Sequence, residues 1–228
     1  MNMKPIIRWT IGMHNPDSYL ALNLSIENFH KIYNNRFDYY VCYNNCNSDH
    51  ITKKIKLKLI DQREHIHDLP CLPSTTSWKL YPPRLNEETH EIFMDNDIII
   101  YKSIDLIDAF LSSNNMTIMT EGYHRRFGTF DDRIKPHVKY NSGLIGIPPK
   151  FDFKNKIIQL LGNNTLEDWF DEQGLVAYIL SNHTNFQCIT LKEIQICYED
   201  LCFGISGIHF VGLNSNKNRF WSKFLSPM

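Results

Sequence analysis

The sequence has no excess of charge of one sign, because 24 lysine and arginine residues balance 25 aspartate and glutamate residues. The net charge of -1 creates no overall field that would recruit nucleic acid or an anionic membrane. No apolar run approaches the roughly 18 residues that a membrane span needs, and the N-terminus lacks the apolar centre of a signal peptide. We therefore expect a cytoplasmic protein with no integral membrane segment and no nucleic-acid partner.

The chain also has little that would build a disulfide framework or a zinc site. Its six cysteines include Cys42 and Cys46, which are four residues apart, but no second close pair follows at the spacing of zinc ligands. Without a secretory signal, free thiols are the default state of cysteine. We therefore expect no structural zinc.

What is present is the composition of a globular domain, with 43% hydrophobic and 21% charged residues. A chain of 228 residues buries about 70% of its unfolded surface on folding and needs no covalent staple. Internal repeats, low-complexity segments and Gly/Ser linkers are absent. These features predict a single domain over residues 1–228.

Apolar segments with strand character alternate with helical segments along the chain. The predicted strands are 6–13, 37–43, 91–94, 98–101, 116–119 and 142–147, and the predicted helices are 19–33, 104–111 with Ser103 as its N-cap, and a helical region that Thr165 opens. Such alternation indicates an α/β fold with parallel strands. Ligands of these sheets bind at the carboxyl ends of the strands, so we expect the chemistry in the loops there.

The clearest chemical signature is Asp95-Asn96-Asp97, which lies between two apolar segments. Carboxylates at positions i and i+2 of an extended chain point to the same side, about 6.6 Å apart. An unpaired buried carboxylate is too costly to keep ionised, whereas carboxylate oxygens suit Mg²⁺ or Mn²⁺, ions that bring diphosphate oxygens with them. The alternative is a polar turn between two strands, where Asp and Asn are common.

Three further segments carry polar groups, and each has a purely structural alternative. Residues 140–146 form a small-residue turn whose Asn141 amide can reach ligand hydroxyls, or a simple strand entry. Residues 171–175 open a helix whose acidic residues are either ligand groups or N-terminal caps. Residues 208–212 contain His209, and an isolated histidine is more often a core or surface residue than a metal ligand.

In this order, the four segments resemble the motifs of glycosyltransferases with the GT-A fold. More closely, they resemble the retaining group of glycosyltransferase family 8, which contains glycogenin and the bacterial galactosyltransferases of lipooligosaccharide synthesis. The corresponding positions are Asp95 and Asp97, Asn141 and Gly143, residues 172–175, and residues 209–212 with Lys217 and Trp221. The resemblance extends over about residues 6–221 and implies a mixed, mostly parallel sheet flanked by helices.

The resemblance also implies how a nucleotide-sugar donor is bound. Asp97 and His209 would bind Mn²⁺ or Mg²⁺, and Asp95 would bind the metal or the donor's ribose. The other implied donor-binding residues are Thr10 and Tyr19 near a uracil base, Lys79, Arg84 and Lys217 at the diphosphate, and Asn141, Gly143 and Glu172 at the sugar.

The implied catalytic segment is Asp171-Glu172-Gln173. Inverting transferases need a carboxylate base on the acceptor side, whereas the retaining group has an amide there, and Gln173 matches that amide. We expect Asp171 to be a helix cap with lowered proton affinity, which leaves Glu172 for the sugar hydroxyls. Residues 121–140 form a long segment rich in Arg, His and aromatic residues, and we expect it to contact the acceptor.

The sequence therefore predicts a metal-dependent glycosyltransferase that moves a sugar from a nucleotide-sugar donor, UDP-linked, to a glycan or another hydroxyl acceptor, with retention. One alternative is a non-catalytic domain that binds a nucleotide or sugar on the same scaffold. The other is a sugar nucleotidyltransferase. Such an enzyme usually carries a Gly-rich phosphate loop near its N-terminus, and residues 10–15 contain only one glycine.

Overall fold

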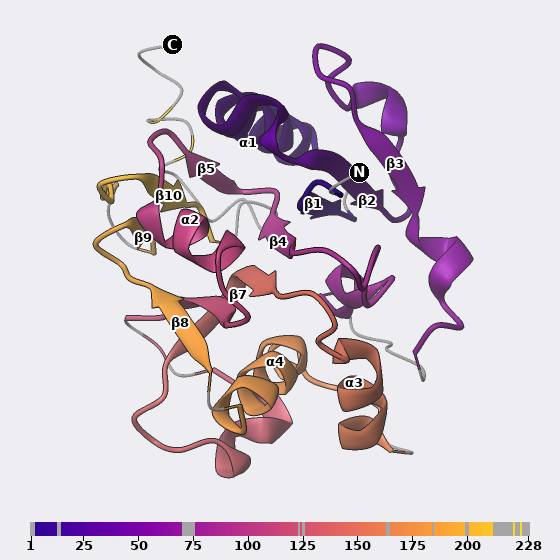
Figure 1. Cartoon of the computed structure of the whole chain (residues 1–228), viewed down its shortest axis with the longest axis vertical. Coiled ribbons are helices and arrows are strands. Elements are labelled where there is room, and N and C mark those ends of the chain that lie inside the picture. The colour runs from indigo at the N-terminus through magenta and orange to yellow at the C-terminus, as the bar shows by residue number, and fades with distance from the viewer. Residues whose placement is uncertain are drawn as a thin grey trace.

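The central element of the structure is a seven-stranded sheet with the strand order β3-β2-β1-β4-β7-β6-β8 (Figure 1). The structure is a computed structural model, and it describes residues 3–12, 15–69, 76–122, 124, 126–162, 165–183, 185–198, 201–211, 221 and 224. The strands of this sheet are β1 (Ile6–Ile11), β2 (Asp38–Tyr43), β3 (Lys58–Asp61), β4 (Glu91–Asp95), β6 (Met116–Thr120), β7 (Tyr140–Ile147) and β8 (Phe186–Ile189). The sequence missed β3 and β8, which are short and lack a continuous apolar pattern.

The sheet is mixed and mostly parallel. The pairs β1–β2, β1–β4, β2–β3 and β6–β8 are parallel, whereas β7 runs antiparallel between β4 and β6. Because of this reversal, β7 begins at the edge where its neighbours end, with Tyr140 opposite Thr120 and Leu144 opposite Met94. The first residues of β7 are therefore brought to the carboxyl ends of β1 and β4.

A second, three-stranded sheet has the order β5-β10-β9. It consists of β5 (Ile98–Ile100), β9 (Ile194–Ile196) and β10 (Gly207–His209). Only two residues, Asn96 and Asp97, separate β4 in the large sheet from β5 in the small one. The Asp95–Asp97 turn thus lies at the junction of the two sheets.

Helices cover both faces of the large sheet (Figure 1). The α-helices are α1 (Pro16–Tyr33), α2 (Asp105–Leu111), α3 (Phe153–Leu161) and α4 (Asp171–Ser181), and the short 3₁₀ helices are η1 (Asn34–Arg36), η2 (Ser48–His50), η3 (Gln62–His65), η4 (Ser77–Leu80) and η5 (Gly128–Arg133). Helix α1 packs on β1 and β5, α4 packs on β7, and α3 packs on α4. The N-terminus of α1 is capped by Asn15, whose side chain accepts from Asp17 N at 2.9 Å.

Two predicted helix starts are wrong. Ser103 does not cap α2, because the helix begins at Asp105 and its N-cap position is Ile104. Thr165 does not open a helix either, since α4 begins only at Asp171. The acidic residues Glu167 and Asp168 look like a first helical turn, but the Asp171 carboxylate binds their backbone N–H groups and holds the segment as a loop.

Alternate residues of the central strands face opposite layers of the molecule. Ile92 and Met94 of β4 belong to the core that α1 covers, whereas Phe93 belongs to the core that α3 and α4 cover. By the same alternation, Glu91 and Asp95 share the face of Phe93. One side of β4 therefore places a buried carboxylate at its start and a second carboxylate at its end.

The carboxylate at the start of β4 is bound by two buried arginines. Arg8 of β1 lies with its Nε 3.3 Å from Glu91 Oε1, and Arg84 places its Nε 3.2 Å from Glu91 Oε2. Arg8 and Glu91 are both fully buried, and the Arg8 guanidinium lies 3.5 Å from the centre of the Phe93 ring. Burial on this scale is tolerated only because each charge has an opposite partner.

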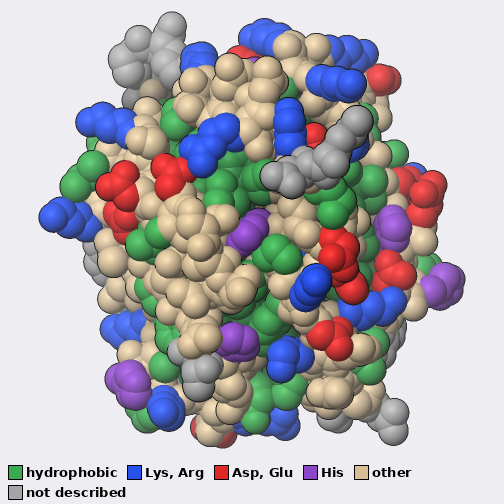
Figure 2. Space-filling view, in the orientation of Figure 1, with side chains coloured by type: hydrophobic (Ala, Val, Ile, Leu, Met, Phe, Trp, Pro, Cys, Tyr) green, Lys and Arg blue, Asp and Glu red, His purple; other side chains and the backbone are tan. Residues whose placement is uncertain are grey.

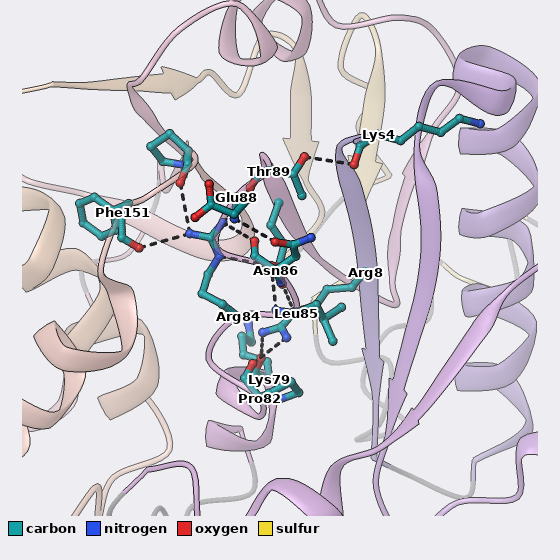
Figure 3. Close-up of polar contacts among 12 residues, drawn as sticks. Lys4, Arg8, Lys79, Pro82, Arg84, Leu85, Asn86, Glu88, Thr89 and Phe151 are labelled. Carbon is teal, nitrogen blue, oxygen red and sulfur yellow. Dashed lines mark hydrogen bonds and ion pairs between the residues drawn. The ribbon is translucent and has the colours of Figure 1, made fainter. Parts of the chain in front are cut away.

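The remaining donors of the two arginines bind main-chain carbonyl groups (Figure 3). Arg8 donates to the carbonyls of Lys79 and Pro82, at 2.9 and 2.6 Å. Arg84 donates to the carbonyls of Asn86, Thr89, Pro148 and Phe151. The network therefore fixes the segment between η4 and β4 against β1 and the loop after β7.

Charged side chains of both signs are distributed over the face seen in Figure 2. No helix in the described part of the chain is both long and apolar enough to cross a bilayer.

We expect Glu91→Gln to destabilise the fold by about 3–5 kcal/mol, because it leaves two buried guanidinium groups without a counter-charge. The matched control is Arg36→Met, which breaks the Arg36–Asp108 pair on the surface, where both side chains are about half exposed; its effect should stay below about 1 kcal/mol. Urea unfolding monitored by circular dichroism measures both values. A loss for Glu91→Gln as small as that of the control would contradict the role of this network.

Candidate active site

A cavity of about 650 Å³ opens at the carboxyl ends of β1 and β4, beside the start of β7 and the first turn of α4. This volume is in the range of small-molecule and cofactor sites. The residues predicted from the sequence that line it are Thr10, Lys79, Asp95, Asp97, Asn141, Glu172, Gln173 and His209. The cavity therefore brings together side chains from six separate segments of the chain.

Asp95, Asp97 and His209 form a cluster on one wall of this cavity. His209 Nε2 lies 3.2 Å from Asp97 Oδ1 and 3.9 Å from Asp95 Oδ2. Asp97 and His209 are 9% and 3% exposed. The pairing of the small sheet explains the geometry, because His209 of β10 is opposite Ile98 of β5, the residue after Asp97.

The donor set of this cluster fits a divalent cation. One potential ligand atom from each residue lies within 4.8 Å of the others. Asp97 Oδ1 is buried and has no partner with hydrogen-bond geometry among the described residues. Two carboxylate oxygens and an imidazole nitrogen suit Mn²⁺, and the oxygens also suit Mg²⁺. Burial lowers the pKa of His209, but the neighbouring carboxylates of Asp97 and Asp95 outweigh it, so the net pKa is raised.

Among the described lining residues, Lys79 is the only lysine or arginine that contacts the acidic residues of the cavity directly. Its Nζ lies 2.8 Å from Asp95 Oδ1 and 3.5 Å from Glu172 Oε2, and it also donates to the Ser142 carbonyl at 3.2 Å. Burial lowers the pKa of Lys79, but the Asp95 and Glu172 carboxylates raise it by more, so the ammonium stays charged. The cavity therefore holds a fixed positive charge beside the acidic cluster.

Glu172 is 3% exposed and lies in the first turn of α4. Burial raises the pKa of its carboxyl from 4.5 to about 7, although Lys79 and the Ser142 hydroxyl oppose the rise. Oε2 accepts from Ser142 Oγ at 3.2 Å, and Oε1 is buried without a hydrogen-bond partner among the described residues. Oε1 is thus open to a hydroxyl donor from a ligand.

Asn141 and Gly143 hold the start of β7 against His209. Asn141 Oδ1 accepts from Gly143 N at 2.8 Å, and Asn141 Nδ2 donates to Glu121 Oε2 at 3.2 Å. A Cβ at position 143 would lie only 2.6 Å from His209 Cε1. Glycine is required there because any side chain would push the imidazole out of the cluster.

Gln173 is held between β7 and the predicted acceptor segment. Its Oε1 accepts from Ser142 N at 3.2 Å, and its Nε2 donates to the Arg126 carbonyl at 2.8 Å. The amide therefore lines the cavity beside Glu172 with a defined orientation. Its contact with the Arg126 carbonyl brings it next to the 121–140 segment.

The structure places Asp171 outside the cavity lining, in a structural role. Its carboxylate accepts from Thr129 N and Oγ1 and from the backbone N–H groups of Glu167 and Asp168. The predicted bonds to backbone N–H groups are present, but they come from the preceding loop and from η5 rather than from the turn of its own helix. Both carboxylate oxygens are therefore occupied by donors from the protein.

Arg84 and Tyr19, two of the implied donor-binding residues, are not among the described residues that line the cavity. Arg84 binds Glu91 at the opposite end of β4, because the loop that carries it turns back toward the amino end of the strand. The Tyr19 hydroxyl accepts from Asn47 N, and its ring packs on His50. Lys217 lies outside the described residues.

Sequence reasoning missed several lining residues, among them Ser142, Glu121, Tyr198 and Arg126. Ser142 lies inside the recognised 140–146 segment, and Glu121 directly follows β6, so a search of strand ends would have found both. The Tyr198 hydroxyl donates to the buried Glu121 carboxylate. No sequence signal marks Tyr198, because its place depends on the small sheet.

The fold is the GT-A fold that the motifs predicted. The chain is similar to solved structures of the galactosyltransferase LgtC, one in complex with donor and acceptor sugar analogs (TM-score 0.58, 10% identity) and one an active-site mutant (TM-score 0.56, 10% identity), each covering 90% of this chain and 87% of that one. It is also similar to mouse xyloside xylosyltransferase 1 in its apo form, with a TM-score of 0.58 and 11% identity over 92% of this chain and 98% of that one. No protein-family model and no curated protein matches the sequence.

The raised pKa of Glu172 predicts a pH-dependent stability. The native state binds the carboxyl proton more tightly than the unfolded chain, so the free energy of unfolding falls as the pH rises from 4.5 to about 7. Relative to that of Glu172→Gln, the free energy of unfolding of the wild type should fall by about 3 kcal/mol over this range. Urea unfolding in EDTA at about pH 5 and about pH 8 measures the difference.

Glu167→Gln serves as the control, since Glu167 is an exposed residue on the neighbouring loop. Its stability relative to the wild type should not change with pH. An identical pH dependence for the wild type and Glu172→Gln would show that Glu172 ionises at its ordinary pKa.

Proposed function

We propose that this protein is a glycosyltransferase, a single GT-A domain over residues 1–228 that moves a sugar from a UDP-linked donor to a glycan or another hydroxyl acceptor. The observation that carries the proposal is the convergence of Asp95, Asp97 and His209 with Lys79 in one cavity of this fold. The likeness to a galactosyltransferase and a xylosyltransferase supports the reaction class. The GT-A sheet positions these four side chains at its strand ends, and they provide the ligands for a metal ion and a positive charge.

Asp95, Asp97 and His209 would hold the metal ion, Mn²⁺ or Mg²⁺. When bound, such an ion offsets the negative charge that develops on a departing diphosphate, which is Lewis-acid catalysis. Lys79 contributes a fixed ammonium to the same charge, and its hydrogen bond to the Ser142 carbonyl keeps it at the strand ends. In the donor complex, Lys79 exchanges part of its contact with Asp95 for phosphate oxygens.

The polar groups at the start of β7 and α4 would bind the transferred sugar. Glu172 Oε1 has no hydrogen-bond partner among the described residues, its Oε2 accepts from Ser142 Oγ, and Asn141 lines the same cavity. Hydroxyl groups of a sugar satisfy exactly such acceptors and donors, whereas an apolar ligand would leave them unpaired. Thr10, at the end of β1, lines the part of the cavity next to Asp95 and is our candidate for contact with the nucleoside.

We propose that transfer proceeds with retention. Asp171 lies two residues before Gln173. Its carboxylate accepts hydrogen bonds from Thr129 and from the backbone of Glu167, so it cannot serve as a base. Gln173 lines the cavity with an amide, and an amide can stabilise charge on the sugar but cannot remove a proton. This combination favours a reaction in which no protein carboxylate removes the acceptor's proton for attack from the opposite face of the sugar.

UDP with Mn²⁺ should raise the melting temperature by about 5–11 °C. A ligand at 100 times its Kd stabilises the native state by about 2.7 kcal/mol. For a domain of this size, each kcal/mol raises the melting temperature by about 2–4 °C. UDP with EDTA should give a much smaller shift. Differential scanning fluorimetry measures both.

Asp97→Ala should remove the metal-dependent part of this shift, because the carboxylate that anchors the cation is gone. Asp49→Ala is the matched control, since Asp49 is an exposed surface carboxylate, and it should keep the full shift. If no nucleoside diphosphate gives a metal-dependent shift with the wild type, the proposed donor site is wrong. A shift without turnover of any nucleotide-sugar would instead favour a non-catalytic binding domain.

An α-linked UDP-sugar should give an α-linked product, which proton NMR of the product identifies. Gln173→Ala should lower turnover by about 10²–10³-fold, the usual cost of removing one positioned polar group from an active site. It should leave the metal-dependent UDP shift intact, since Gln173 contacts neither the acidic cluster nor Lys79. A β-linked product would overturn the assignment of retention.

A further inference from the structure

The wall of the cavity beyond Gln173 is aromatic. Trp169 and Phe170, the last two residues before α4, line the cavity together with Trp78 and Arg126. Trp169 is 53% exposed, whereas tryptophan is highly buried on average. An exposed aromatic surface at the rim of a polar cavity is a feature of binding sites.

This aromatic wall, Trp169 with Phe170, is held in place by the surrounding loops. The Trp169 carbonyl accepts from Thr76 Oγ1 at 2.7 Å, and Phe170 N donates to Asp168 Oδ1 at 2.8 Å. The Arg126 guanidinium lies 5.3 Å from the centre of the Phe170 ring. The exposed indole is therefore presented by a positioned backbone, which reduces the entropy cost of binding a ligand against it.

Contacts of Glu172 and Gln173, which are neighbours in α4, connect two parts of the cavity lining that differ in chemistry. On one side, Lys79 links Glu172 to Asp95 and the metal-binding cluster. On the other, Gln173 binds the Arg126 carbonyl, and Arg126 stacks on Phe170 beside Trp169. The charged side suits a nucleoside diphosphate. The aromatic side has a different chemistry and suits a different ligand.

We propose that the aromatic wall of Trp169 and Phe170 is the acceptor subsite, and that the acceptor is a saccharide whose pyranose ring stacks on Trp169. This inference rests on the proposed transferase function and names the acceptor class for the same cavity. A pyranose ring has an apolar C–H face that covers an indole and a rim of hydroxyls that needs polar partners. Arg126 and Gln173 supply such partners at the edge of the wall.

Other acceptors fit this wall less well. A lipid chain would cover the exposed Arg126 guanidinium without satisfying its donors, which is costly. A serine or threonine hydroxyl of a polypeptide offers no flat apolar face for Trp169. A saccharide satisfies both the ring and the cation, and it places a hydroxyl toward Gln173, where the transferred sugar would be.

Tryptophan fluorescence gives a direct test. Of the four tryptophans, Trp9 and Trp221 are buried and Trp78 is partly buried, so acrylamide quenching reports chiefly on Trp169. The probes are methyl pyranosides of glucose, galactose, mannose and xylose, added to protein that is saturated with UDP and Mn²⁺. We expect at least one of them to reduce quenching in a saturable manner.

Trp169→Ala should weaken binding of that glycoside by about tenfold, measured by calorimetry, because the stacking surface is lost. Trp169→Phe, which keeps an aromatic face, should stay within about threefold of the wild type. Phe203→Ala is the matched control, because Phe203 is 57% exposed and does not line the cavity among the described residues; it should bind like the wild type. The metal-dependent UDP shift of Trp169→Ala checks that the cavity is folded.

Three outcomes would overturn the proposal: no glycoside protects the fluorescence, Trp169→Ala binds as tightly as the wild type, or Phe203→Ala is as weak as Trp169→Ala. Protection by an alkyl detergent or a hydroxyl-bearing peptide, without protection by any glycoside, would overturn the acceptor class. Glycoside binding that depends on Trp169 in a protein with no metal-dependent UDP shift would support the saccharide subsite and contradict only the transferase function.

Discussion

The structure depends on the pairing of Glu91 with Arg8 and Arg84. Three charged groups are buried at the start of β4, and they are tolerable there only because each has an opposite partner and the terminal guanidinium nitrogens of both arginines donate to carbonyls. The same network sets the position of the active-site cation, since Arg8 and Gln62 bind the carbonyls around η4, the helix that carries Lys79. A charge cluster outside the cavity thus determines where the ammonium inside it lies.

Within the cavity, acidic groups outnumber basic ones. Asp95, Asp97 and Glu172 face a single ammonium and one imidazole, and burial raises the pKa of Asp95 and Glu172 because their ionised forms are poorly compensated. A divalent cation would complete this charge balance, and a diphosphate would in turn balance the cation and Lys79. In the proposed function, metal and donor binding would therefore be coupled by electrostatics.

The two sides of the cavity are built differently. The charged side is formed by the ends of strands and by the junction of two sheets, so its geometry follows from hydrogen-bonded registers such as His209 opposite Ile98. The aromatic side is formed by loops that flank α4 and follow β6. Loops tolerate change in length and sequence better than strands do. In the proposed function, the donor would therefore be bound by strand ends and the acceptor by loops.

The sequence by itself determined the α/β class, five strands of the large sheet, the Asp95–Asp97 turn and the segments around Asn141, Glu172 and His209, because these depend on local pattern and on short motifs. It did not determine the reversal of β7, the small sheet, or the loop that delays α4 to Asp171, because each rests on contacts between distant segments. For the same reason it could not separate Lys79, which Arg8 turns into the cavity, from Arg84, which Glu91 holds away from it. Both are cations just before the same strand, and only the tertiary structure decided which one faces the ligand.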